Sequence, residues 1–191
     1  TLEGFVAWPD DLAAHYRQTG LWEGLTLMQM FERTAQRTPD KLALVWAEQR
    51  WTYAALLRRS RRLAVGLRRS GIQRGERVLM QLPNTPDFVF TYLALNAIGA
   101  IPVMALRAHR HAEVRHFLRA SAATAYVLPD VLGSFDYRAM AAQMQAEFAG
   151  LRQVLVAGEP GAGQGALMSL IDASLCDAQV ALELAADAPQ S

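Results

Sequence analysis

The chain has 191 residues, of which 52% are hydrophobic and 19% are charged, and its formal net charge is +1. This composition excludes a disordered chain and predicts a globular protein of one domain or slightly more. The near-neutral charge gives no reason to expect a nucleic acid or a membrane surface as a partner. Cys176 is the only cysteine. The sequence therefore predicts no internal disulfide framework, and with no signal peptide in view we expect a cytoplasmic location.

Helical and extended patterns divide the chain into three parts. We expect N-terminal helices in residues 1–40, an α/β core in residues 41–184, and a linker or chain end in residues 185–191. In the core, strands are predicted at residues 41–46 and from 51, which form a hairpin, and at 77–82, 101–106, 125–128 and 154–157. Helices are predicted at residues 53–70, 87–98, 113–120, 137–148 and 167–176. Helices between successive strands predict an α/β fold, a mostly parallel sheet with flanking helices and right-handed crossovers.

The first long core helix carries the clearest local signals. Thr52 can cap its start, Gly71 ends it, and leucines at positions 56, 63 and 67 form one apolar stripe. Arginines crowd the same helix at positions 58, 59, 61, 62, 68 and 69. Such a run predicts a solvated helix face, and docking of an acidic partner such as a carrier protein is the functional alternative.

Residues 88–106 contain no charged side chain and have about the length of a membrane span. Gly99 and Pro102 divide this run into a helical piece and a short extended piece. A helix followed by a short apolar strand is typical of a buried parallel sheet, so we expect scaffold here and no membrane span.

Two further segments could carry chemistry. The glycine-rich residues 158–165 follow a strand and precede a predicted helix, as a phosphate-binding loop would, but they lack the Gly-Lys-Ser/Thr ending and are interpreted as a surface turn. A basic cluster contains His109, Arg110, His111, Arg115 and His116, and its spacing predicts no zinc site. His109 and Arg110 end a predicted parallel strand, where crevices open. We favour a loop-fixing role for this pair over substrate contact.

All four tryptophans, at positions 8, 22, 46 and 51, lie in the first quarter of the chain. They are interpreted as packing anchors for the N-terminal helices rather than as part of a cofactor site.

Several motifs resemble the acyl-adenylate-forming ligases, and most closely their aryl-acid branch, the 2,3-dihydroxybenzoate–AMP and salicylate–AMP ligases of siderophore biosynthesis. Gln-Leu-Pro-Asn (residues 81–84), Gly-Ala-Ile-Pro-Val (residues 99–103) and Ala-Leu-Arg-Ala-His-Arg (residues 105–110) match that branch in order and spacing. Arg107 departs from it, because the branch usually has proline there. Trp8, Trp22, residues 38–44, 51–56 and 135–138 extend the resemblance across residues 8–138.

The resemblance implies an enzyme that uses ATP and Mg²⁺ to convert an aryl acid into an acyl-adenylate. A phosphopantetheine thiol on an aryl carrier protein then takes the acyl group. The family's phosphate loop, its acids for Mg²⁺ and ribose, and its mobile lysine all follow the matched region, and Lys41, the only lysine, lies in another motif. We therefore expect the first third of such a ligase, inactive alone, with no catalytic, cofactor-binding or metal-binding residue and with His109 and Arg110 as crevice-loop candidates.

Two alternatives stay open. The chain could belong to a fatty-acid–CoA ligase or an amino-acid-activating relative, or it could be a non-catalytic binding module with half of the ligase fold. The sequence leaves the aryl acid, the acceptor (carrier protein or coenzyme A) and the oligomeric state open. Exposed sheet edges lead us to expect self-association.

Overall fold

A parallel five-stranded sheet organises the computed structural model, which describes residues 6–185. The strand order is β4-β3-β5-β8-β9, and every neighbouring pair is parallel. The strands are β3 (Arg77–Met80), β4 (Ile101–Met104), β5 (Ala125–Pro129), β8 (Gln153–Ala157) and β9 (Gly165–Ala166). The predicted α/β fold with a parallel sheet is confirmed.

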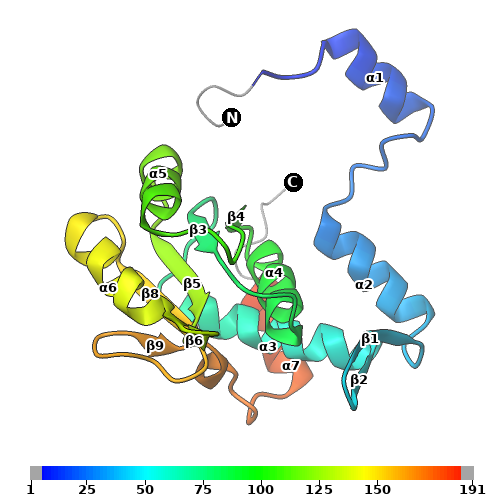
Figure 1. Cartoon of the computed structure of the whole chain (residues 1–191). Coiled ribbons are helices and arrows are strands. Elements are labelled where there is room, and N and C mark those ends of the chain that lie inside the picture. The colour runs from blue at the N-terminus through cyan, green and yellow to red at the C-terminus, as the bar shows by residue number, and fades with distance from the viewer. Residues whose placement is uncertain (1–5, 186–191) are drawn as a thin grey trace.

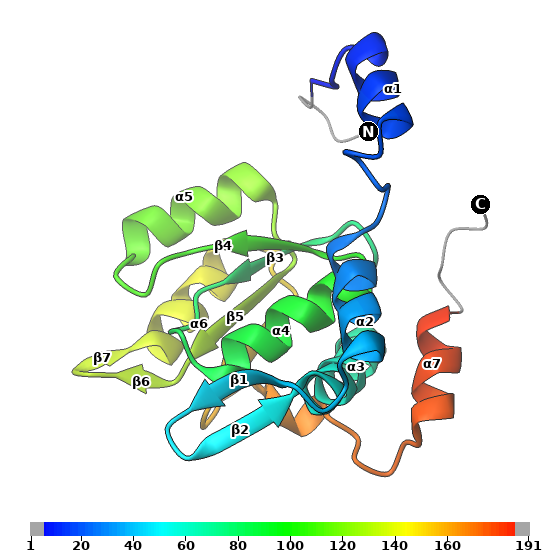
Figure 2. The same cartoon turned by 90° about the vertical axis from the view of Figure 1, so that its right-hand side faces the viewer.

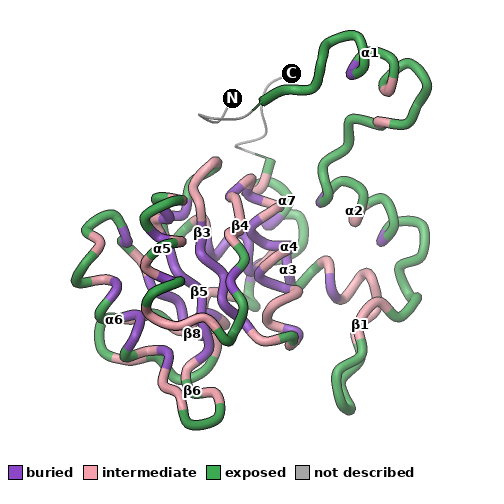
Figure 3. The backbone as a smooth tube through the Cα atoms, turned by 45° about the horizontal axis from the view of Figure 1, so that its top comes forward, coloured by how far each residue is buried: buried purple, intermediate pink, exposed green. Residues whose placement is uncertain are grey.

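Helices cover both faces of this sheet (Figures 1 and 2). On one face Val78 and Met80 pack with residues of α3 (Tyr53–Arg69) and α4 (Pro86–Ala97). On the other face Leu79 packs with residues of α5 (His111–Ser121) and α6 (Tyr137–Glu147). Successive residues of a strand point to opposite faces, so a continuous apolar strand can serve two cores. Figure 3 shows the buried residues concentrated in the sheet and the helices against it.

The N-terminal segment adds two helices and a hairpin to this core. Helix α1 (Asp10–Gln18) lies away from the sheet in both views, and α2 (Leu27–Arg37) packs against α3 (Figures 1 and 2). The hairpin consists of β1 (Leu42–Trp46) and β2 (Gln49–Thr52), which pair antiparallel as predicted. Thr52 accepts a hydrogen bond from the Ala55 N–H, which confirms the predicted cap of α3.

Short elements complete the chain. Strands β6 (Val131–Leu132) and β7 (Phe135–Asp136) form a small antiparallel ribbon, η1 (Met168–Leu170) is a 3₁₀ turn, and α7 (Asp177–Ala185) packs against α3. The predicted linker at 185–191 lies outside the described residues except for Ala185, which ends α7. Between residues 6 and 185, no helix is long and apolar enough to cross a membrane.

The predicted helix at residues 167–176 is wrong. Only η1 forms there, and Ile171 already has an extended backbone. The Asp172 carboxylate accepts hydrogen bonds from the backbone and the hydroxyl of Ser174, and such local bonds compete with a helix. The last helix therefore begins later, at Asp177.

The strand predicted at residues 101–106 forms but ends early, and the expectation that it is buried is wrong. Strand β4 lies at the edge of the sheet, ends at Met104 and is only partly buried, with Met104 48% exposed. Pro102 fits an edge strand because it has no N–H for a further neighbour. The preceding helix α4 is buried as expected, and its buried side chains include Phe90 and Leu95.

Among the arginines of α3, Arg61, Arg62 and Arg69 pair with acidic side chains, whereas Arg58 and Arg59 are exposed. Arg61 contacts Glu32 of α2 at 2.7 Å, and Arg69 contacts Glu183 of α7 through two hydrogen bonds. Below this ionic layer Val65 packs with Leu175 and Val180. The solvated face that the sequence predicts is therefore partly covered by the chain's own helices.

The four tryptophans differ in their packing and exposure. Trp51 packs edge-on against Phe90 of the core, with ring centroids 5.6 Å apart. Trp8 and Trp22, on either side of α1, pack edge-on with their ring centroids 5.7 Å apart. Trp46 is 46% exposed. Trp22 packs in the N-terminal segment as predicted, Trp51 packs on the core instead, and Trp8 and Trp46 are both largely exposed.

Candidate functional site

The carboxyl ends of the parallel strands form the candidate site. The chain runs from β3 outward to β4 and then returns past β3 to β5, so the strand order reverses between β3 and β5. In open parallel sheets, ligands bind outside the carboxyl ends of the strands at this reversal. Residues 81–84 follow β3, residues 105–110 follow β4, and Asp130 follows β5.

Gln81 joins the sheet to the loop after β4. Its side chain is fully buried, and its Nε2 donates hydrogen bonds to the carbonyls of Leu106 at 2.8 Å and His109 at 3.0 Å. Its Oε1 accepts a hydrogen bond from the hydroxyl of Tyr126 on β5. Burial raises the pKa of Tyr126 well above its usual range, so this hydroxyl stays protonated and donates. One amide thus fixes the path of residues 105–110, which we call the crevice loop.

His109 and Arg110 stabilise the same crevice loop. The Nδ1 atom of His109 accepts a hydrogen bond from the Leu106 N–H at 3.0 Å. The guanidinium of Arg110 donates to the carbonyls of Arg107 at 2.7 Å and His109 at 2.8 Å, and it stacks 4.1 Å from the Phe135 ring centroid. Both partly buried side chains thus contact their own loop, which is the role that the sequence favours over substrate contact.

Tyr137 holds the crevice loop from α6. This side chain is buried, and its hydroxyl donates a hydrogen bond to the Arg107 carbonyl at 2.6 Å. Three side chains, those of Gln81, Arg110 and Tyr137, thus donate hydrogen bonds to backbone carbonyls of residues 106–109. A loop constrained in this way offers its outward side chains from a fixed position.

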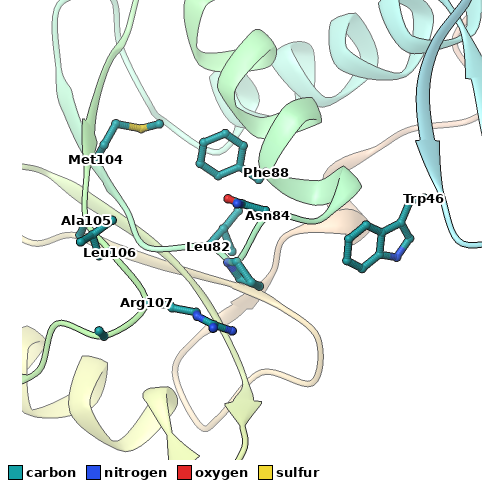
Figure 4. A pocket seen from close by; sticks show the side chains of 10 residues that line it. Trp46, Leu82, Asn84, Phe88, Met104, Ala105, Leu106 and Arg107 are labelled. Carbon is teal, nitrogen blue, oxygen red and sulfur yellow. The ribbon is translucent and has the colours of Figure 1, made fainter.

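An open groove of about 710 Å³ runs between the crevice loop and the start of α4 (Figure 4). Most of its walls are apolar, and the exposed Trp46 of the hairpin is part of them. The lining residues are Trp46, Leu82, Pro83, Asn84, Phe88, Met104, Ala105, Leu106, Arg107 and Ala108. Its size and mostly apolar lining match those of small-molecule sites.

The loop after β8 reaches the same edge of the sheet. Gly158 has φ +133°, and a Cβ placed there would lie 2.4 Å from Oδ2 of Asp130, so the chain needs glycine for this close approach. The same carboxylate oxygen accepts a hydrogen bond from the Glu159 N–H. The loops after β5 and β8, which lie far apart in the sequence, thus meet at this edge of the sheet.

The glycine-rich residues 158–165 form a turn that leads into β9 rather than into the predicted helix. The Gly161 N–H donates to the side chain of Gln164 at 3.0 Å, so this amide is already used within the turn. Among residues 6–185, no group of three His, Cys, Asp or Glu side chains could hold a metal ion.

The sequence singled out His109 and Arg110 but gave Gln81 no structural role. The available signal was a polar residue near the end of the strand predicted at residues 77–82. The partners Tyr126 and Tyr137 lie on elements 45 and 30 residues away from the atoms that they bond, so only the folded chain connects them.

A comparison with known families matches residues 31–167 to the AMP-binding enzyme family. The chain belongs to the AMP-binding enzyme family. The match extends from within α2 to the residue after β9, so it includes the whole sheet and the crevice loop.

Curated relatives support this family assignment. The chain is 40% identical over 158 residues to the 2,3-dihydroxybenzoate-AMP ligase of Bacillus subtilis, which covers 83% of this chain. It is 47% identical over 165 residues to the salicyl-AMP ligase / salicyl-S-ArCP synthetase of Mycobacterium tuberculosis, which covers 84% of this chain. The chain spans 29% of the length of each of these two family members.

A solved structure agrees with the fold. The apo structure of Mycobacterium smegmatis MbtA matches with a TM-score of 0.82 and 36% identity, over 90% of this chain and 32% of that one. The arrangement of sheet and helices is therefore that of a part of a larger member of the AMP-binding enzyme family.

Proposed function

We propose that the chain is the N-terminal part of an aryl-acid adenylating enzyme of siderophore biosynthesis. In the complete enzyme, a carboxylate oxygen of 2,3-dihydroxybenzoate or salicylate attacks the α-phosphorus of ATP, and pyrophosphate leaves. The thiol of a phosphopantetheine carrier protein then takes the acyl group from the acyl-adenylate, and AMP leaves. Mg²⁺ would neutralise phosphate charge during the first step.

One observation carries this proposal. Two relatives that are 40% and 47% identical to the chain are an AMP ligase for 2,3-dihydroxybenzoate and one for salicylate. Both acids are benzoates with a hydroxyl group ortho to the carboxylate, so the proposed substrate class is a 2-hydroxybenzoate. The motifs at residues 81–84 and 99–110 resemble the same branch.

The part that this chain plays is positioning. In the ligases that the motifs resemble, the residues for ATP and Mg²⁺ follow the matched region, so we assign ATP and Mg²⁺ to parts of the enzyme beyond the described residues. Gln81, Tyr126 and Tyr137 fix the crevice loop at the sheet edge where ligands bind, and orientation of reactants is a large part of catalysis in such transfers. We further propose that residues 1–40 are the N-terminal helical segment and residues 41–184 the α/β core.

A segment exchange tests the function. The segment of the Bacillus subtilis 2,3-dihydroxybenzoate-AMP ligase that matches this chain is replaced by this chain, which gives the grafted ligase. We expect the grafted ligase to exchange pyrophosphate into ATP when 2,3-dihydroxybenzoate or salicylate is added. A long-chain fatty acid and phenylalanine are the comparison substrates and should give background exchange.

The control is a grafted ligase with Gly66→Val, which should be destabilised because a Cβ at this position would lie 2.0 Å from the Leu170 carbonyl oxygen. A grafted ligase that melts cooperatively but exchanges nothing with either hydroxybenzoate would contradict the proposal. Exchange supported by the fatty acid or phenylalanine would instead favour another branch of the family.

A further inference from the structure

Arg107 is the one charged side chain among those that line the groove. Its carbonyl is fixed by Arg110 and Tyr137, but its guanidinium makes no hydrogen bond or ion pair within the part of the chain that the structure describes. Arg115, by contrast, pairs with the Glu147 carboxylate at 2.8 Å. The backbone of Arg107 is thus rigid while its charged group is unused.

The surroundings of Arg107 favour an anion. No acidic side chain lines the groove, so none of the lining residues compensates the positive charge. Figure 4 shows the Arg107 side chain extending from the crevice loop toward the segment after β3, where the exposed Asn84 offers an amide. A guanidinium and an amide N–H group together can bind the oxygen atoms of a carboxylate or phosphate.

The remaining walls favour an apolar body on that anion. Trp46 and Phe88 supply aromatic surface, and Leu82, Met104 and Leu106 supply aliphatic surface. Inorganic ions would leave this surface in water, whereas an organic ligand would cover it.

We propose that the groove binds an organic oxyanion, a carboxylate or phosphate joined to an apolar body, with Arg107 as its anion contact. The two candidate sources of such a group follow from the proposed function, so this inference rests on it. One is the carboxylate of the aryl acid, and the other is the phosphate of the acceptor's phosphopantetheine arm.

The rigid crevice loop explains why a single exposed arginine can be selective here. Binding to a flexible arginine costs side-chain and loop entropy, whereas the bonds from Gln81, Tyr137 and Arg110 have already ordered this backbone. Arginine also presents two parallel N–H donors to an oxyanion, and lysine does not. Lysine at position 107 should therefore restore only part of the affinity.

Nuclear magnetic resonance of the ¹⁵N-labelled 191-residue chain tests the site without requiring catalysis. The chain has four tryptophans, and the indole N–H signal of Trp46 is assigned as the one that disappears in Trp46→Phe. The probes are salicylate, pantetheine 4′-phosphate and inorganic phosphate. We expect salicylate or pantetheine 4′-phosphate to shift the Trp46 signal in a saturable way, while the signals of Trp8 and Trp22 stay in place.

The variants locate the contact. Arg107→Ala should weaken binding about tenfold or more, as expected for a lost charge-assisted hydrogen bond, and Arg107→Lys should lie between it and the parent. Arg119→Ala is the matched control, because Arg119 is an exposed arginine on α5 that does not line the groove, and it should bind like the parent. Amide dispersion in each spectrum shows whether the variant folds.

Response to salicylate alone assigns the groove to the aryl acid, and response to pantetheine 4′-phosphate alone assigns it to the acceptor arm. Unchanged affinity in Arg107→Ala would overturn the proposal. So would inorganic phosphate binding as tightly as the organic ligands, or no saturable shift with any probe. Binding by a chain whose grafted ligase shows no exchange would leave the site intact and reject only the proposed function.

Discussion

The buried hydroxyl of Tyr126 donates a hydrogen bond to Oε1 of Gln81, which leaves both N–H groups of the Gln81 amide for the crevice loop. Tyr126 belongs to β5 and Gln81 follows β3, so this contact crosses the sheet at the reversal of strand order. The crevice loop after β4 therefore takes its position from both of the strands that flank the reversal.

Gln81→Leu should destabilise the chain by about 2–4 kcal/mol, because it removes two donors and one acceptor from a buried place and leaves their partners unsatisfied. Urea unfolding followed by circular dichroism measures the change. Gln143→Leu, at an exposed position of α6, is the matched control and should change the free energy of unfolding little. Equal stability of the two variants would show that the Gln81 amide does not hold the loop.

Gly66→Ala should also destabilise, although alanine is the better helix former by about 1 kcal/mol. Gly66 lies inside α3, and a Cβ there would meet the Leu170 carbonyl oxygen at 2.0 Å, so η1 would have to move. Overpacking of this kind costs about 1–3 kcal/mol and should outweigh the helix propensity. Gly150→Ala, which meets no atom within 4 Å, is the control in thermal unfolding. A gain in stability at position 66 would contradict the close packing of α3 on η1.

Glu76 predicts a pH dependence of stability. Burial alone would raise its pKa, but hydrogen bonds from the Gln73 N–H and the Arg152 guanidinium outweigh burial and hold the pKa below its ordinary value. A lowered pKa in the folded state means that the stabilisation is present above the unfolded pKa of glutamate and is lost as the pH falls through the folded pKa.

Glu76→Gln should accordingly lower the free energy of unfolding at pH 7, and the difference from the parent should shrink in acid below both pKa values. Urea unfolding at a series of pH values provides the test, with Glu48→Gln at an exposed hairpin position as control. A difference that stays constant from pH 7 into acid would exclude the carboxylate as its source.

Self-association of the 191-residue chain stays a prediction, and the groove is the surface that we expect to carry it. Leu106 is 68% exposed there, beside Trp46 and Met104, and exposed apolar patches favour association. Leu106→Glu should lower the weight-average mass in sedimentation velocity at high concentration. Leu182→Glu, at a position of α7 that is 74% exposed, should leave it unchanged. A monomer throughout a wide concentration range would reject the prediction.

The sequence predicted most elements of the fold because each strand and helix carries its own local signal. Thr52 caps α3 and the apolar run of β5 is buried, both as patterns of neighbouring residues indicate. The position of β4 at the sheet edge was missed, because an apolar run does not say how many neighbours a strand has. The helix expected at residues 167–176 does not form, because local hydrogen bonds from Ser174 to the Asp172 carboxylate compete with it.

The candidate site was less accessible to sequence reasoning. His109 and Arg110 were found because they follow a predicted strand, where ligand crevices open. Gln81 and Tyr126 were not, since their bond depends on β3 and β5 being neighbours in space. Likewise, only the folded chain shows that the Arg107 guanidinium has no partner among the described residues and lines the groove.

ATP–pyrophosphate exchange by the isolated 191-residue chain and by the grafted ligase, measured side by side, tests most directly whether this chain is one part of an aryl-acid adenylating enzyme. We predict no hydroxybenzoate-dependent exchange by the isolated chain and clear exchange by the grafted ligase with 2,3-dihydroxybenzoate or salicylate. Robust exchange by the isolated chain, or none by a cooperatively folded grafted ligase, would contradict that role.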